Sequence, residues 1–517
     1  MLSSIALLLL ARPTPLPQHE MPAPSVIIAS PANHLFKDVG PCDLPVSTDN
    51  ELARSLTKQG FALIHCFWYN EAVRSLRAAV AQDPNCAIAY AGLALSLSQP
   101  RYFRAQFKAE AEWASARSVS LARNASEAEQ TMIAAIRTGI TAGRDAKAWA
   151  RAFETAMAAQ PDLEEPKVIL AGMLFQLGPS RGGSSEGPDT SNRRIIELCE
   201  QVIKRSPDHA AALHYHVHVC EGSEPERALN SAKKLTRVAI DSPHMVHMPG
   251  HIFYRVGDYE AANAAFYEAD RKSIEYARGL GQQNPGQVVW DYGHNRSFWA
   301  ASLVESARFK EMREKLPGVS YDTMAWLRAG NWKTLYEQSL RQKLTDRFGP
   351  LNSYVAAWAA MEREDWGTFV RATVELKGSI RGDNYSSRIA KTMVAELEGA
   401  RLVRQRQFDE GFARLREAVK EYNRVSYQEP PVFVRLPHET LGAALTARGE
   451  YAEAIEVFQA GLKERPNSVF VWIGLADAYR QSGDTAKAKD LYDKIVKSDA
   501  DRECGPVTRA TVALAEM

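Results

Sequence analysis

The chain carries, from Gly442 to Ile495, the stretch GAALTARGEYAEAIEVFQAGLKERPNSVFVWIGLADAYRQSGDTAKAKDLYDKI. Its first half places four residues at helical spacing: Ala454, Phe458, Gly461 and Pro466. Three of these positions recur 34 residues later as Ala488, Tyr492 and Ile495. Small residues let two helices cross closely, and proline favours the first turn of the next helix. The stretch therefore predicts two successive helical hairpins built from one repeating unit.

The same offsets return in other parts of the chain. They are met by Ala72, Leu76, Ala79 and Pro84, and again by Ala262, Phe266 and Ala269. Weaker copies lie at 153–161 and 199–207. From Glu51 onward the apolar residues keep helical spacing, and long alternating runs of β-branched residues do not occur. We therefore expect an all-α chain.

The repeated unit resembles the tetratricopeptide repeat, a helix–turn–helix of about 34 residues. The resemblance implies tetratricopeptide-like helical hairpin repeats stacked into a superhelical solenoid. It also implies that the first helix of each unit lines a concave groove and that a small residue in this helix packs against the second helix. Binding or catalytic residues are then expected on the groove.

The pattern along the chain predicts four parts. They are a leader or signal segment at 1–20, an extended arm at 21–50, a first repeat array at 51–320 and a second array at 321–517. Composition also predicts three interruptions, namely a flexible loop at 179–191, a break between helices at 279–287 and an extended segment at 427–437. The histidine-rich site described below falls in the first array.

Composition limits the class of protein. The 517 residues are 45% apolar and 24% charged, as is common for soluble globular proteins. The net charge is +1 and no basic run stands out, which argues against a nucleic-acid-binding protein. Six cysteines without CxxC spacing predict neither a disulfide scaffold nor a cysteine-ligated zinc site.

The first residues leave the location of the protein open. The apolar run from Ile5 to Ala11 is too short to span a bilayer but long enough for the core of a signal peptide. No lysine or arginine precedes it, and Arg12 with Pro13 makes a poor cleavage site. The protein is exported if this segment is a signal peptide, and cytoplasmic if it is an unstructured leader.

Seven of the twelve histidines lie between residues 209 and 251. They are His209, His214, His216, His218, His244, His247 and His251, and His294 follows downstream. At about 100° per residue, two sets each share one side of a helix. The sets are His214 with His218 and Glu221, and His244 with His247 and His251. Pro249 argues that the second helix begins only near that residue, because proline is tolerated in the first turn.

The repeat register predicts the direction of these side chains. If Gly250 is the small residue of its unit, the resemblance implies that the His244 set occupies groove-facing positions. The His214 set does the same around Val217, and His294 does so around Ala300. Three successive units would then direct imidazoles towards one region of the groove.

Clustered imidazoles with a carboxylate are the ligands that zinc, copper or iron prefer. We predict a transition metal ion with His214, His218, His247 and His251 as its principal ligands. Further predicted ligands are Glu221, His244 and His294, with Glu221 also a general base. His209 and His216 are expected to lie outside the site. One ion with supporting partners and two ions with three ligands each both stay open. The alternative is a buried hydrogen-bond network that joins adjacent repeats.

Other side chains near the histidines could hold a substrate. Tyr254 and Arg255 follow His251 on the predicted groove side, and Arg255 could bind a carboxylate or form a structural ion pair. Trp290 and Tyr292 could form the wall of a pocket, although aromatic residues at helical spacing also fill cores.

A closer resemblance is carried by several blocks of sequence. They include ALHYHVHVCEGSEPERAL at 212–229, HMPGHIFYRVG at 247–257, YGHN at 292–295 and PPVFVRLPHETLGAAL at 430–445. These blocks look like those of a large, mostly bacterial branch of tetratricopeptide-repeat proteins with an HMPxHI-type histidine motif, many of which carry export signals. The chain departs from that pattern at His65-Cys66, where a serine commonly follows the histidine.

Three functions are therefore expected, in order of preference. The first is a metal-dependent enzyme whose histidine-ligated ion, in the groove, acts on a small organic substrate, with oxidation slightly favoured. The second is a non-catalytic interaction module that binds a peptide or protein in the groove, with the histidines structural. The third is a zinc-dependent hydrolase.

Overall fold

Helices account for the regular structure of the chain. The computed structural model describes residues 35–99, 107–178, 190–317, 319–341, 350–425, 427 and 429–517, and within these ranges no strand occurs. No helix in the described ranges combines the length and the apolar character needed to cross a bilayer. The predicted leader, the start of the arm and the loop over 179–189 lie outside the described residues.

The chain divides into two compact units. The first contains the described residues up to Ile252 together with Tyr267–Tyr292, and the second contains Phe253–Phe266 and Gly293–Met517. The predicted division after residue 320 falls within the second unit.

The first half of the chain forms the following helices. They are α2 (Glu51–His65), α3 (Tyr69–Gln82), α4 (Ala87–Leu97), α5 (Lys108–Leu121), α6 (Glu127–Ala142), α7 (Ala146–Ala159), α8 (Glu165–Leu177), α9 (Thr190–Arg205), α10 (Ala210–Cys220), α11 (Leu229–Leu235), α12 (Pro243–Arg255) and α13 (Tyr259–Gly279). The predicted break at 279–287 holds one short 3₁₀ turn, Pro285–Gln287.

The second half continues in the same manner. Its helices are α14 (Tyr292–Glu305), α15 (Phe309–Lys315), α16 (Val319–Ala329), α17 (Trp332–Arg341), α18 (Pro350–Glu362), α19 (Trp366–Gly378), α20 (Tyr385–Arg404), α21 (Phe408–Tyr422), α22 (Pro437–Arg448), α23 (Tyr451–Glu464), α24 (Val469–Ser482), α25 (Thr485–Lys497) and α26 (Gly505–Glu516).

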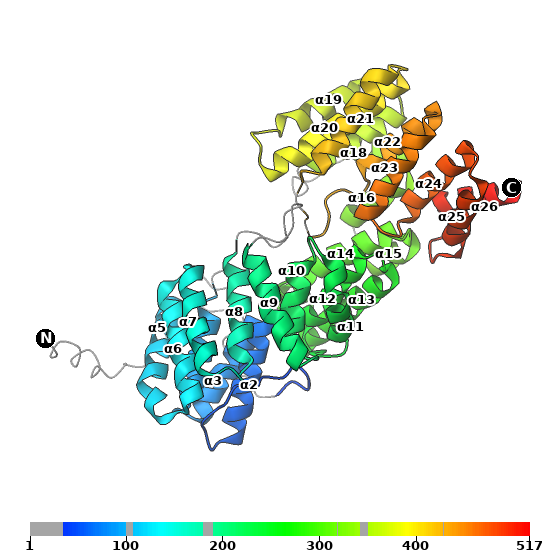
Figure 1. Cartoon of the computed structure of the whole chain (residues 1–517). Helices are drawn as coiled ribbons and strands as arrows, with labels where there is room; N and C mark the ends of the chain where they lie inside the picture. The colour runs from blue at the N-terminus through cyan, green and yellow to red at the C-terminus, as the bar shows by residue number, and fades with distance from the viewer. Residues whose placement is uncertain are drawn as a thin grey trace. The chain divides into compact units, whose positions relative to one another are not determined.

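Consecutive helices pair as hairpins within each unit. Examples are α2 with α3, α4 with α5, α20 with α21 and α24 with α25 (Figure 1). Alternate helices also touch, in the series α18, α20, α22, α24 and α26. Because the first helix of one hairpin packs against the first helix of the next, the hairpins stack as a repeat array does. The predicted all-α fold of stacked helical hairpins is confirmed.

Eight turns between consecutive helices share a residue with positive φ at one position. A residue with positive φ stands two positions before the second helix at Phe67, Gly257, Ala307, Gly330, Glu364, Arg406, Gly449 and Gly483. Glycine reaches this left-handed region without steric cost, whereas the other residue types are held there by the surrounding structure. Recurrence of this turn in glycine and non-glycine residues indicates that the repeat geometry, rather than local sequence, fixes it.

Close helix crossings explain the small residues of the repeat. The Phe458 ring of α23 lies against Gly442 of α22 and Gly474 of α24, where an added Cβ would come within 2.7 and 2.3 Å of the ring. Leu76 of α3 occupies the equivalent place between Gly60 and Gly92. These large residues recur at one repeat position because each fills the space that two glycines leave.

The helix that carries the second histidine set starts earlier than expected. Pro249 was predicted to lie in the first turn, but α12 runs from Pro243 to Arg255 with Pro249 inside it. Pro243 supplies the favourable first-turn proline, and buried neighbours such as Met245, Met248 and Ile252 hold the remainder in helical conformation despite the lost N–H. His244 and His247 are therefore helical.

Contacts between distant helices of the first unit prepare the histidine site. Helix α2 packs against both α8 and α10, so the carboxyl end of α2 lies beside the first histidine set. The described part of the arm is tied to the same unit, since the Lys37 and Asp38 amides donate to the Asp241 carboxylate at 2.8 and 2.9 Å. Sequence periodicity alone does not predict either contact.

The buried imidazole of His438 predicts acid sensitivity of the second unit. Its ring packs edge-on against Tyr422 with centroids 5.7 Å apart, and burial lowers the pKa of His438 from its ordinary 6.5. The unfolded chain then binds a proton before the folded protein does, so stability falls as pH drops below about 6.5. We expect the His438→Gln protein to lose less unfolding free energy as the pH falls, by up to about 1.4 kcal/mol per pH unit. Urea midpoints at several pH values measure it, and identical pH dependence in both proteins would count against it.

Candidate metal centre

Three histidines of the first unit bring their Nε2 atoms together. His214 and His218 lie one turn apart on α10, and His244 lies in the first turn of α12. The Nε2 atom of His244 is 3.1 Å from that of His214 and 3.3 Å from that of His218. One nitrogen from each ring lies within 4.8 Å of the others, and all three residues are buried. We call these residues the histidine triad.

The other ring nitrogens decide where the protons of two triad members lie. His214 Nδ1 is 2.7 Å from the carbonyl oxygen of His65, and His244 Nδ1 is 2.7 Å from Asp291 Oδ2. A carbonyl or an ionised carboxylate can only accept, so Nδ1 carries the hydrogen in both rings. When both rings are neutral, the Nε2 atoms of His214 and His244 therefore face each other with lone pairs at 3.1 Å.

This arrangement is unfavourable unless a positive charge lies between the nitrogens. Burial, and after it the neighbouring His244, holds the pKa of His214 well below its ordinary value, which disfavours a second proton on the His214 ring. A tetrahedral ion with metal–nitrogen bonds of about 2.0–2.1 Å separates its ligands by about 3.3 Å. The separations of 3.1 and 3.3 Å thus fit a shared ion.

A second pair of histidines differs in geometry. His251 Nδ1 is 2.7 Å from Glu221 Oε1, and its Nε2 is 2.5 Å from His247 Nε2. Two ligands of one tetrahedral ion would be about 3.3 Å apart, so 2.5 Å fits a shared proton better. Glu221 thus contacts His251, whereas His214 and His218 contact His244 instead.

Aromatic rings surround the triad. The centroid of Phe67, in the turn after α2, lies 4.8 Å from His214, 5.5 Å from His218 and 5.4 Å from His244. Phe175 of α8 lies 4.7 Å from His218. These apolar side chains keep the nitrogens dry and strengthen electrostatic interactions at the site.

Hydrogen bonds among the buried side chains of His65, Tyr215 and Glu165 support the triad. His65 Nδ1 is 2.9 Å from the Tyr215 hydroxyl, and its Nε2 is 2.8 Å from Glu165 Oε1. Burial alone would raise the pKa of Glu165, but the adjacent His65 lowers it below its ordinary value. The charged carboxylate fixes the His65 ring and with it the end of α2, whose His65 carbonyl holds His214.

Other predicted site residues occupy several places. Trp290 lies beside the triad with its ring 5.2 Å from His244, whereas Tyr292 packs near Ala277 and Val289. His294 belongs to the second unit, where its Nε2 is 3.8 Å from Glu429.

Tyr254 and Arg255 also belong to the second unit. The Tyr254 ring packs edge-on against Tyr259 and Phe298, with centroids 5.7 and 6.0 Å away. The Arg255 guanidinium lies 4.6 Å over the Tyr427 ring, which is a cation–π contact.

The two histidines expected outside the site have separate partners. His216 Nδ1 is 2.9 Å from Ser231 Oγ, and His209 Nε2 is 3.9 Å from Glu164. Both rings are buried, and burial lowers the pKa of each.

Sequence reasoning missed the residues that support the triad. Asp291 stands inside the WDYGHN block, which drew notice for its aromatic residues and His294. An aspartate next to Trp290 was the available signal. The sequence gives no signal for Phe67 or for the carbonyl of His65, because their proximity to α10 depends on the packing of α2.

Comparison with known proteins supports the repeat. A tetratricopeptide repeat family model matches residues 445–504. This part of the chain is similar to the tetratricopeptide repeat. The match includes most of the stretch from which the repeat was predicted, but not the HMPGHIFYRVG block, so membership of the bacterial branch stays a prediction. A search of curated proteins finds no significant match.

Several solved helical-repeat structures are similar to the chain. A human IFIT1 dimer with m7Gppp-AAAA is 11% identical, with a TM-score of 0.31, over 88% of this chain and 92% of the other. Yeast Tom70 is 12% identical, with a TM-score of 0.26, over 90% of each chain. The P58(IPK) TPR domain is 11% identical, with a TM-score of 0.20, over 90% of this chain and 98% of that domain. Similarities this low carry no conclusion about ligands.

Proposed function

We propose that the protein is a metal-dependent enzyme whose ion is held by His214, His218 and His244. One observation carries the proposal: two Nε2 atoms, in rings whose Nδ1 atoms contact the His65 carbonyl and Asp291, face each other at 3.1 Å in a buried site. Three imidazoles leave a position open on a tetrahedral ion, which is the arrangement of catalytic rather than structural sites.

The residues around the triad have distinct roles in this proposal. Phe67 and Phe175 exclude water, and Asp291 keeps His244 in the tautomer that presents Nε2. Trp290, which is 42% exposed and 5.2 Å from His244, offers a flat apolar surface for a small organic substrate at the edge of the site. The His247–His251–Glu221 group can hold or accept a proton. When bound, the metal supplies Lewis acidity or redox capacity.

The ligand set favours copper or zinc over iron. Non-haem iron usually takes a carboxylate together with two histidines, and Glu221 instead contacts His251 at 2.7 Å. Copper would support the oxidation that we favour, whereas zinc would support hydrolysis. Metal identity therefore separates the two reactions.

Elemental analysis of protein purified without a histidine tag tests the proposal. We expect close to one equivalent of copper or zinc per chain, with an electron paramagnetic resonance signal if the ion is Cu(II). Dialysis against a chelator should remove the ion with little loss of helical circular dichroism. Protein that contains no metal and binds none on titration would overturn the proposal.

The Asp291 carboxylate predicts a weaker site when it is neutralised. Asp291→Asn removes the charge that fixes the proton on His244 Nδ1, so we expect metal affinity to fall about 10–100-fold. Competition with a chromophoric chelator measures the change. Asp208→Asn, at a largely exposed position of the first unit, should retain wild-type affinity. Equal affinity of the Asp291 variant would contradict the assigned role.

A second function is a non-catalytic interaction module that binds a peptide or protein. The burial of the triad, with relative exposures of 0, 5 and 4%, favours it because a structural site is closed to ligands. In that case removal of the metal unfolds the first unit, and a chelator lowers its melting temperature. Because any ion bound by the folded state raises the melting temperature, the enzyme is supported by metal loss that leaves the first unit folded.

A further inference from the structure

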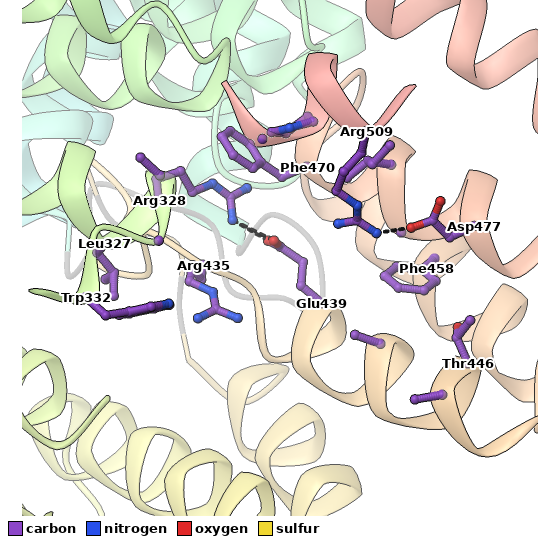
Figure 2. A pocket seen from close by; sticks show the side chains of 18 of the residues that line it. Leu327, Arg328, Trp332, Arg435, Glu439, Thr446, Phe458, Phe470, Asp477 and Arg509 are labelled. Atoms are coloured by element: carbon purple, nitrogen blue, oxygen red, sulfur yellow. Dashed lines mark hydrogen bonds and ion pairs between the residues drawn. The ribbon is translucent and has the colours of Figure 1, made fainter. Parts of the chain in front are cut away.

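The second unit contains a pocket separate from the histidine triad. Its volume is about 400 Å³, and α16, α22 and α24 contribute to its wall together with the start of α26 (Figure 2). The lining includes the aromatic side chains of Trp332, Phe458 and Phe470. Pockets of about 300–1,000 Å³ accommodate small ligands or a few residues of a peptide.

One arginine in this pocket is fully neutralised. Arg328 Nη1 lies 2.7 and 2.6 Å from the two carboxylate oxygens of Glu439, and its Nη2 lies 3.0 Å from Glu305 Oε1. The guanidinium also covers the Phe470 ring at 3.9 Å from its centroid. With two carboxylate partners, Arg328 has no charge left for a ligand.

A second arginine is paired across the opposite wall. Arg509 donates to the Asp477 carboxylate, and Figure 2 shows this pair on the far side of the pocket from Arg435. The lining thus includes three arginines, of which Arg328 and Arg509 have carboxylate partners.

Arg435 is the remaining arginine and differs from both. Its guanidinium lies 4.8 Å from the ring centroid of Trp358 and 5.8 Å from that of Trp332. Within the described ranges no carboxylate forms an ion pair with it. The buried Glu396 carboxylate, which Tyr354 and Thr440 contact, interacts with Arg435 electrostatically without forming an ion pair.

We propose that this pocket binds an organic carboxylate, with Arg435 donating two parallel hydrogen bonds to it and the aromatic wall receiving an adjoining apolar group. The planar guanidinium group matches a carboxylate in geometry. Trp332 and Trp358 restrict the orientation of the guanidinium plane before the ligand binds. The ligand is either a free organic acid or the carboxyl terminus of a peptide, and the experiment separates these sources.

Matched ligands that differ only in charge test the proposal. Calorimetric titration of the full chain, with a chelator present so that carboxylates do not bind metal at the triad, compares 3-phenylpropionate with 3-phenylpropionamide. A second pair is an acetylated tripeptide that ends in phenylalanine, as the free acid and as the amide. We expect each acid to bind at least about 10-fold more tightly than its amide. Tighter binding of the peptide acid points to a polypeptide ligand, and tighter binding of phenylpropionate to a free acid.

Variants connect that preference to Arg435. Arg435→Gln should remove the about 10-fold preference for the acid, and Arg435→Lys should restore part of it. Arg416→Gln, which breaks a pair between Arg416 and Glu453 on the surface, should retain the full preference. Circular dichroism melting checks that the variants fold. Equal affinity for acid and amide in the wild type, absence of binding, or an unchanged preference in Arg435→Gln would overturn the proposal.

Discussion

His214→Ala and His218→Ala are each expected to lose the bound metal while the helices remain. Both imidazoles present Nε2 to His244, at 3.1 and 3.3 Å, so removal of either leaves two ligands for the ion. We expect a larger loss of affinity than the about 10–100-fold that a supporting partner costs. The measurement is metal content per chain after gel filtration, together with circular dichroism melting.

His216→Ala is the matched control for these variants. His216 is buried on the same helix, between the two ligands in sequence, but its Nδ1 lies 2.9 Å from Ser231 Oγ. It should keep its metal. Retention of metal in both ligand variants, or loss of metal from the His216→Ala control as well, would contradict the assignment of the triad.

His251→Ala separates the triad from the second histidine pair. Sequence analysis predicts His251 among the principal ligands, whereas its 2.5 Å separation from His247 fits a shared proton. If the triad alone holds the ion, this variant keeps about one equivalent of metal. A second equivalent in the wild type, lost in His251→Ala, would establish two ions.

Phe458→Ala is expected to lower the free energy of unfolding of the second unit by about 3–5 kcal/mol. The ring is buried and fills the space between Gly442 and Gly474, where no other side chain can replace it because both positions lack a Cβ. Truncation therefore leaves a cavity at the centre of the tetratricopeptide-repeat segment.

Urea unfolding followed by far-ultraviolet circular dichroism measures this loss. Phe458→Leu should cost less, because a leucine fills the same place at Leu76 in the first unit. Glu456→Ala, at an exposed position of the same helix, should change stability by no more than about 0.5 kcal/mol. A Phe458→Ala protein within about 1 kcal/mol of wild type would show that the crossing contributes little.

The repeat pattern predicted more of the fold than of the site. Phe458 and Leu76 recur at one offset in the sequence, and both prove to fill the gap between two glycines. The start of α12 that Pro249 predicts is wrong. Local propensity disfavours a proline inside a helix, but the burial of neighbouring side chains outweighs that cost.

The candidate site depended on contacts that the sequence does not record. Helical spacing placed His214 and His218 on one side of α10, and that is how they lie. Their meeting with His244, rather than with His247 and His251, depends on where the first turn of α12 lies relative to α10, which a pattern within one helix cannot specify.

The sequence by itself determined the helical hairpins and the helix faces on which the histidines lie, because side-chain direction follows from a period of about 3.6 residues within a single helix. Only the tertiary structure decided which histidine nitrogens meet and which of the lining arginines forms no ion pair within the described residues. Proton position and charge balance depend on partners such as the His65 carbonyl, Asp291 and Glu439, which are 149, 47 and 111 residues away from the side chains that they hold.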